Sequence, residues 1–225
     1  MSNRDIIVFD FETGGRNPVT CQPTQLAAIA LDGRNFRLKG EFNSKIWAET
    51  DDDKAIKKGL GPIEEGALKV TGQTREEIAK APKPKVVWKK FCAFVDKYNW
   101  KGTSFFAPIA AGYNILGYDM IIVDRLCKEH GPWDDQRQRQ KLFHQIHKID
   151  MMDNYYMWTE GDPSVKSRSM DAIRDRMGMS TENAHDALQD VKDTANLMIK
   201  FMKTHRAVYR NLKLEKAFAN GNTYL

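Results

Sequence analysis

The feature that most constrains the fold is a β-branched and aromatic run at residues 5–11, DIIVFDF, which leads into a polar stretch with two glycines. A run of this length and composition is typical of a buried strand. Two further strand candidates follow at residues 25–31 and 36–46, and the pair Asp32-Gly33 between them is a strong hairpin signal. We therefore expect the chain to begin as an antiparallel meander.

The pattern changes in the middle of the chain. Residues 109–114 form another short apolar run, a helical pattern covers 116–129, and residues 146–151 are the last strand candidate. A strand, a helix and a strand in succession predict a parallel crossover. The sequence therefore indicates an α/β fold with a mixed sheet, antiparallel at its start and parallel later.

The remaining segments complete the expected organisation. Residues 47–61 are polar and contain two glycines, which predicts a surface loop. Helices are expected in the segment that ends near Tyr98, at 169–177 and at 186–205. We assign residues 1–210 to one domain and residues 211–225 to a C-terminal tail.

Composition excludes several classes of protein. The 225 residues are 41% hydrophobic and 29% charged, which is the mix of an ordinary globular domain and not of a disordered or collagenous chain. The three cysteines are far apart and odd in number, so they fit neither a disulfide framework nor a zinc site, and a reducing cytoplasm is expected. The sequence contains no apolar run long enough to span a membrane and no export signal at its start. The net charge of +5 is compatible with a polyanionic partner but does not require one.

Asp10 and Glu12 lie two positions apart at the end of the first strand candidate. Because side chains alternate along a strand, both carboxylates share one face while Phe9 and Phe11 occupy the other. The alternative is a strand that simply runs out into solvent.

Asp119 is placed unusually for an acidic residue. Ile122 and Val123 follow it at helical spacing, so its carboxylate points along an apolar helix face and would need a partner there. The alternative is an acidic residue in a first turn, favoured by the helix dipole.

His185 precedes Asp190 by five positions at the start of the last long helix. Five positions on a helix correspond to about 140° of rotation, so the two side chains converge only if His185 lies before the helix. A capping role for Asp186 would permit that. The alternative is a histidine at the surface or in a cap.

Three segments distant in sequence thus each place acidic residues at the end of an element, and one adds a histidine. Clustered carboxylates repel one another unless a cation neutralises them, and two divalent metals about 3.5–4 Å apart would do so. Such a set suits metal-assisted phosphodiester hydrolysis.

These residues resemble the three motifs of the DEDDh, or DnaQ-like, 3'-to-5' exonuclease family. The motifs stand here as FDFETG at 9–14, as GYNILGYD at 112–119, and as His185 with Asp190. Within the family the strongest resemblance is to the nuclease domain of bacterial exonuclease I. It rests on QPTQLAAI at 22–29, VTGQT at 70–74 and NAHDA at 183–187. The similarity extends from about residue 6 to residue 203.

The resemblance implies a ribonuclease H-like fold, in which helices flank a mixed five-stranded sheet, and hydrolysis of nucleic acid to 5'-mononucleotides with two Mg²⁺ or Mn²⁺ ions. Carried over to this chain, it assigns metal binding to four residues: Asp10, Glu12, Asp119 and Asp190. Asp10 would bridge the two ions, and His185 would be the general base that takes a proton from the attacking water. The same four carboxylates and His185 are the catalytic set.

Substrate contacts are expected from three further residues: Thr13 and Gly14 beside the terminal sugar, and Asn114 next to a carboxylate or the substrate. A basic tract either contacts the phosphate backbone or forms a solvated loop, and it comprises Arg137, Arg139, Lys141, His144 and Lys148.

The expected partner is a single-stranded nucleic acid, with DNA favoured over RNA and no membrane partner. The alternatives are an exoribonuclease of the same chemistry and, from another class, a catalytically silent nucleic-acid-binding module. The sequence has no counterpart to the C-terminal domains of exonuclease I, so we expect distributive digestion.

Overall fold

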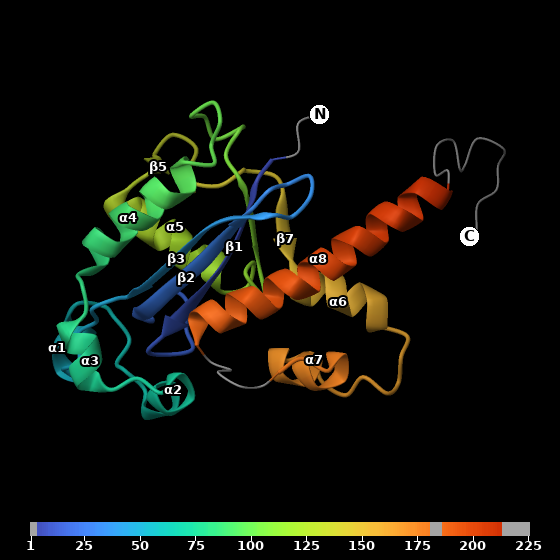
Figure 1. Ribbon diagram of the computed structural model, residues 1–225. Coiled ribbons are helices and arrows are strands. Elements are labelled where there is room, and N and C mark those ends of the chain that lie inside the picture. The colour runs from blue at the N-terminus through green and yellow to red at the C-terminus, as the bar shows by residue number, and fades with distance from the viewer. Residues whose placement is uncertain (1–3, 181–185, 213–225) are drawn as a thin grey trace.

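In a computed structural model of the protein, the structure describes residues 4–180 and 186–212. Its main sheet has five strands in the order β3-β2-β1-β4-β7 (Figure 1). The strands are β1 (Ile6–Thr13), β2 (Pro23–Leu31), β3 (Leu38–Lys45), β4 (Ile109–Gly112) and β7 (Lys148–Asp150). The first three strands pair antiparallel, whereas β1, β4 and β7 pair parallel. The predicted mixed sheet is confirmed.

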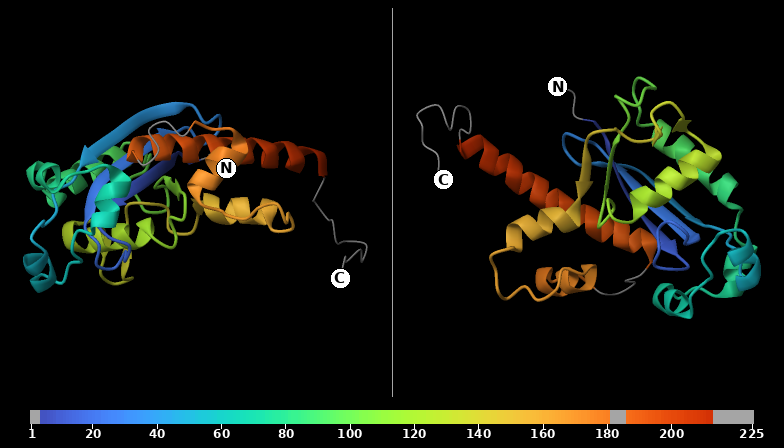
Figure 2. Two further views of the ribbon diagram at one scale, coloured as in Figure 1. Left: turned by 90° about the horizontal axis from the view of Figure 1, so that it is seen from below. Right: turned by 180° about the vertical axis from the view of Figure 1, so that it is seen from behind.

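Helices cover both faces of this sheet. They are α1 (Asp52–Lys57), α2 (Glu65–Thr71), α3 (Arg75–Lys80), α4 (Pro84–Asp96), α5 (Asp119–His130), α6 (Met151–Thr159), α7 (Met170–Met177) and α8 (Ala187–Leu212). In Figure 1 α8 crosses the front of the sheet, and the rear view of Figure 2 shows α5 crossing the back. A small hairpin of β5 (Trp133–Asp134) and β6 (Arg139–Gln140) follows α5.

Alternation along β1 explains the two layers. Ile7, Phe9 and Phe11 pack into the core formed with α4 and α5. Ile6 and Val8 point the other way, into the core formed with α6, α7 and α8. Because both faces of β1 are buried, every side chain along it is held in a defined direction until the strand ends.

The segment 47–61 differs from the prediction of a loop, because it contains α1. Asp51 caps this helix by accepting a hydrogen bond from the Lys54 N–H at 3.1 Å, and Ala55 is fully buried beneath it. The polar composition hid a helix in which Ala55 is the one buried side chain.

The last helix is longer than the sequence pattern predicted. α8 runs to Leu212, and its C-terminal part projects beyond the sheet (Figures 1 and 2). The expected tail therefore overlaps the helix at its first two residues, and residues 213–225 lie outside the described part of the chain. No helix in the described part is long and apolar enough to cross a membrane.

Candidate active site

Asp10 and Glu12 lie where β1 leaves the core. They continue the face of Ile6 and Val8, which is the face covered by α8. Both side chains are only partly exposed. Asp10 and Glu12 therefore share one face of β1, as the sequence pattern predicts.

Asp190 reaches the same place from α8. Asp186 precedes this helix and accepts hydrogen bonds from the backbone N–H groups of Leu188 and Gln189, as an N-cap does. Ala187 and Val191 are fully buried against the sheet, and this orientation turns Asp190 toward the end of β1. One carboxylate oxygen each from Asp10, Glu12 and Asp190 lie within 4.8 Å of one another.

Asp119 approaches from the other layer. It is the first residue of α5, is 3% exposed, and accepts a hydrogen bond from the Phe11 N–H at 3.1 Å. Phe11 stands between Asp10 and Glu12 in sequence, so this bond ties Asp119 to the strand that carries them. Asp119 is not a member of the group of three described above.

Burial and mutual repulsion raise the pKa values of these carboxylates. Burial, followed by the charge of Asp190, raises the pKa of Asp10 to about 7, while Arg174 opposes the shift. Burial and the neighbouring Asp10 raise the pKa of Glu12 to about 8. Burial and Asp10 also raise the pKa of Asp119 well above its ordinary value. Crowded carboxylates of this kind favour a cation among them.

The donor set fits divalent magnesium or manganese. Carboxylate oxygens are the ligands that these hard cations prefer, and three of them converge here from two elements. Within the part of the chain that the structure describes, this group consists of carboxylates alone. His185, the predicted base, lies outside the described residues.

Thr13 is the last residue of β1, and Gly14 begins the bend that follows it. The Thr13 hydroxyl contacts the Tyr118 hydroxyl at 2.7 Å, and both hydroxyls hydrogen-bond to the Gly15 carbonyl. Gly14 is buried, and a Cβ there would lie 2.3 Å from the side chain of Ile63. A larger residue at this position would therefore require the Ile63 side chain to move.

Asn114 lies in the loop between β4 and α5 with a positive φ of 55°. Its backbone N–H donates to the Asp150 carboxylate at 2.9 Å, and so does that of Leu116 at 3.0 Å. Asp150 is buried at the end of β7 and also caps α6 through the Met152 N–H. Asp150 therefore holds the loop that leads into Asp119.

Sequence reasoning missed Asp150, Tyr118 and Arg174. The one available signal was that Asp150 lies near the end of a strand candidate, as Asp10 does. The basic tract, by contrast, runs from the β5–β6 hairpin to Lys148 in β7, which is an edge strand, whereas Asp10 and Glu12 lie on the central strand β1. Within it Arg137 pairs with Asp134 at 3.4 Å.

Comparisons with known proteins identify a family for this chain. A family model described as RNase T, exonuclease, matches residues 7–198. No curated protein sequence matches the chain.

Solved structures share the fold at low sequence identity. Escherichia coli exonuclease I in complex with a dT13 oligonucleotide has a TM-score of 0.68 and 19% identity, covering 93% of this chain and 43% of that one. Exonuclease I from Methylocaldum szegediense has a TM-score of 0.67 and 20% identity, covering 91% and 41%. Cell-death related nuclease 4 has a TM-score of 0.64 and 14% identity, covering 90% and 65%. The chain thus spans less than half the length of the exonuclease I structures.

Proposed function

The chain belongs to the RNase T family of exonucleases, and we propose that it hydrolyses single-stranded DNA from the 3' end to 5'-mononucleotides with two divalent cations, Mg²⁺ or Mn²⁺. The observation that carries this proposal is the convergence of Asp10, Glu12 and Asp190, with ligand atoms within 4.8 Å. A purely structural role does not account for three adjacent carboxylates, because their repulsion costs stability.

Each carboxylate has a proposed part. Asp10, Glu12 and Asp190 would hold one cation, and Asp10 would share the second with Asp119. When bound, the cations stabilise the attacking and departing oxygens of the phosphoryl transfer. Asp119 suits its part because the Phe11 N–H holds it in place.

His185 is proposed as the general base that removes a proton from the attacking water. Its support is its position in the chain, directly before Asp186 and five residues before Asp190. A neutral imidazole accepts a proton readily near neutral pH.

A cavity of about 300 Å³ opens beside Glu12, and we assign the 3'-terminal nucleoside to it. Its lining comprises Phe11, Glu12, Thr13, Gly15, Arg16, Glu64, Gly66, Ala67, Val70, Thr71 and Tyr118. Val70, which is exposed, offers an apolar surface for a base, while Thr13 and Tyr118 offer hydroxyls for a sugar. Glu12 belongs both to the lining of this cavity and to the proposed metal ligands. A nucleoside in the cavity would therefore have its phosphodiester next to those carboxylates.

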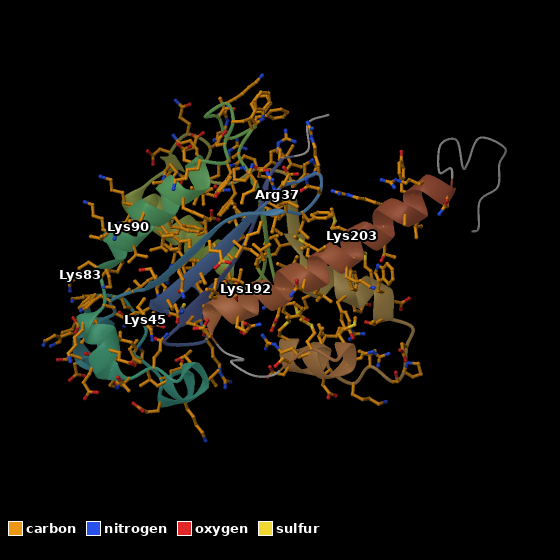
Figure 3. All side chains as sticks on the ribbon, viewed as in Figure 1. Arg37, Lys45, Lys83, Lys90, Lys192 and Lys203 are labelled. Atoms are coloured by element: carbon orange, nitrogen blue, oxygen red, sulfur yellow. The ribbon has the colours of Figure 1, made fainter. Side chains whose placement is uncertain are left out.

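Lys45 is a candidate for contact with the phosphate backbone. It pairs across the sheet with Gln25, and Gln25 pairs with Glu12, so the three residues form a row on one face of β3, β2 and β1. Figure 3 shows Lys45 and Lys192 toward the end of the sheet where α8 begins. A strand leaving the carboxylates along this row would meet Lys45 two strands away.

DNA is supported as the substrate by the E. coli exonuclease I structure, which was solved with a dT13 oligonucleotide. The competing substrate is single-stranded RNA, which differs by the 2'-hydroxyl. End-labelled DNA and RNA of matched sequence, single-stranded and duplex, test the proposal with Mg²⁺ or Mn²⁺. We expect single-stranded DNA to be shortened from its 3' end. Faster cleavage of RNA would reassign the substrate, and no cleavage of any strand would overturn the proposal.

A further inference from the structure

Arg174, on α7, is a buried arginine that contacts the acidic group. Its side chain is 1% exposed, whereas arginine is rarely buried unless its charge is paired. Three nitrogens of the guanidinium each donate to a different carboxylate: Nη2 to Asp190 at 2.6 Å, Nε to Asp193 at 2.8 Å and Nη1 to Asp171 at 3.1 Å. The guanidinium therefore bonds three carboxylates at once.

Two of these partners belong to the same face of α8. Asp190 and Asp193 are three positions apart, so both point toward α7. The second oxygen of Asp193 accepts a hydrogen bond from the Gln189 side chain at 2.8 Å. Both oxygens of Asp193 thus accept hydrogen bonds, and its buried ion pair with Arg174 joins α7 to α8.

The contact with Asp190 goes beyond such a link, because Asp190 also belongs to the group with Asp10 and Glu12. A hydrogen bond from Arg174 to one carboxylate oxygen of Asp190 fixes the plane of that carboxylate. The guanidinium stays positively charged at every working pH, and its charge also acts on Asp10.

We propose that Arg174 is a positioning residue for metal binding. It holds the Asp190 carboxylate in the orientation that lets Asp190, Asp10 and Glu12 bind one divalent cation together, and it offsets part of the repulsion among them. This inference rests on the proposed function, since it takes those three carboxylates as metal ligands. Partners that orient a metal ligand typically contribute 10- to 100-fold in metal affinity.

The test is calorimetric titration of the full chain with Mn²⁺ alone, without substrate. Arg174→Met should raise the Mn²⁺ dissociation constant about 10- to 100-fold. Arg174→Lys should recover part of the lost affinity. A lysine supplies the positive charge, but its one nitrogen cannot reproduce the planar arrangement of donors in a guanidinium. The matched control is Arg176→Met on the same helix, since Arg176 is half-exposed and pairs with Asp162 at 2.5 Å. The control should bind Mn²⁺ as the wild type does.

Loss of Arg174 also leaves Asp193 buried without its partner, which lowers the thermal midpoint. The double variant Arg174→Met/Asp193→Leu removes that unpaired charge and should regain most of the thermal midpoint measured in chelator. The double variant still lacks the hydrogen bond from Arg174 to Asp190. We therefore expect its Mn²⁺ affinity to remain weak.

Each result has one meaning. Unchanged or tighter Mn²⁺ binding by Arg174→Met overturns the inference, because repulsion between Arg174 and the cation would then match or exceed the benefit of orientation. Restored binding in the double variant overturns it too, since Arg174 would then act only through folding. Absence of Mn²⁺ binding in the wild type would overturn the proposed function itself.

Discussion

The Phe11 N–H donates a hydrogen bond to the Asp119 carboxylate at 3.1 Å, so the acidic strand and the first turn of α5 are joined at a buried point. Asp119→Asn keeps an oxygen acceptor for this bond but removes the charge. We expect it to abolish nuclease activity and to raise the thermal midpoint measured in chelator, because burial and Asp10 both oppose the ionised form. Asp119→Ala, which leaves the Phe11 N–H unpaired, should be less stable than Asp119→Asn. Equal stabilities of the two variants would contradict a role for the hydrogen bond.

Asp10 is the proposed ligand of both cations, so Asp10→Ala should abolish cleavage. The metal-free variant should be at least as stable as the wild type, because one of several mutually repelling carboxylates is gone. Turnover with Mg²⁺ and the thermal midpoint in chelator measure the two effects. Appreciable cleavage by Asp10→Ala, or full wild-type activity in excess chelator, would contradict the two-metal assignment.

The stability of the metal-free protein should depend on pH through the raised pKa values of Asp10, about 7, and Glu12, about 8. Between the ordinary carboxyl pKa near 4 and these values, the folded state holds protons that the unfolded chain releases. The contribution of both groups to the free energy of unfolding is therefore complete below about pH 4 and is lost as pH rises toward 8. Thermal midpoints in chelator from pH 5 to pH 8.5 should fall more steeply for the wild type than for Glu12→Gln. Parallel curves would show that Glu12 does not titrate in this range.

His185 is the proposed general base, and His185→Ala should lower the turnover number about 10²- to 10⁴-fold while substrate still binds. The rate of the wild type should climb with pH through the range where an ordinary imidazole loses its proton, about 6.5. The variant should lack this dependence. A variant with a near-normal rate and the same pH profile would leave His185 without a catalytic role.

Lys45 should affect substrate binding and not the chemical step. Lys45→Ala should weaken the affinity for a single strand and reduce the slope of log affinity against log salt by about 0.7, the contribution of one phosphate contact. Lys90→Ala is the matched control, because Lys90 lies on α4 (Figure 3), which packs on the face of the sheet opposite to α8. Equal slopes for Lys45→Ala and the wild type would exclude the contact.

Local patterns sufficed to predict the meander, the crossover and the shared face of Asp10 and Glu12. Each of these follows from the spacing of apolar residues along one element, which is visible in the sequence. The contacts of Arg174 could not be predicted in this way, because its partner Asp190 is 16 positions away on another helix. The role of Asp150 was hidden for the same reason, since it binds the backbone of Asn114 across 36 positions.

The short helix α1 shows another limit of pattern reasoning. Its sequence, DDKAIK, offers no apolar stripe from which a helical period can be counted, and its signal is a single cap at Asp51. Long elements such as α8 were recognised more easily, although the end of α8 was misplaced by seven residues, from His205 to Leu212.

The projecting end of α8 divides that helix into two regions of different local stability. The buried side chains of α8 all lie between Ala187 and Phe201, and from Val208 to Asn211 every side chain is exposed. The first part can open only by separating from the sheet, whereas the exposed residues 208–211 bury little surface and can fray independently. Amide hydrogens should therefore exchange with solvent fastest near Leu212 and progressively more slowly toward Val191. Since Asp190 lies at the slow end, fraying of the projecting turns would leave its position in the acidic group undisturbed.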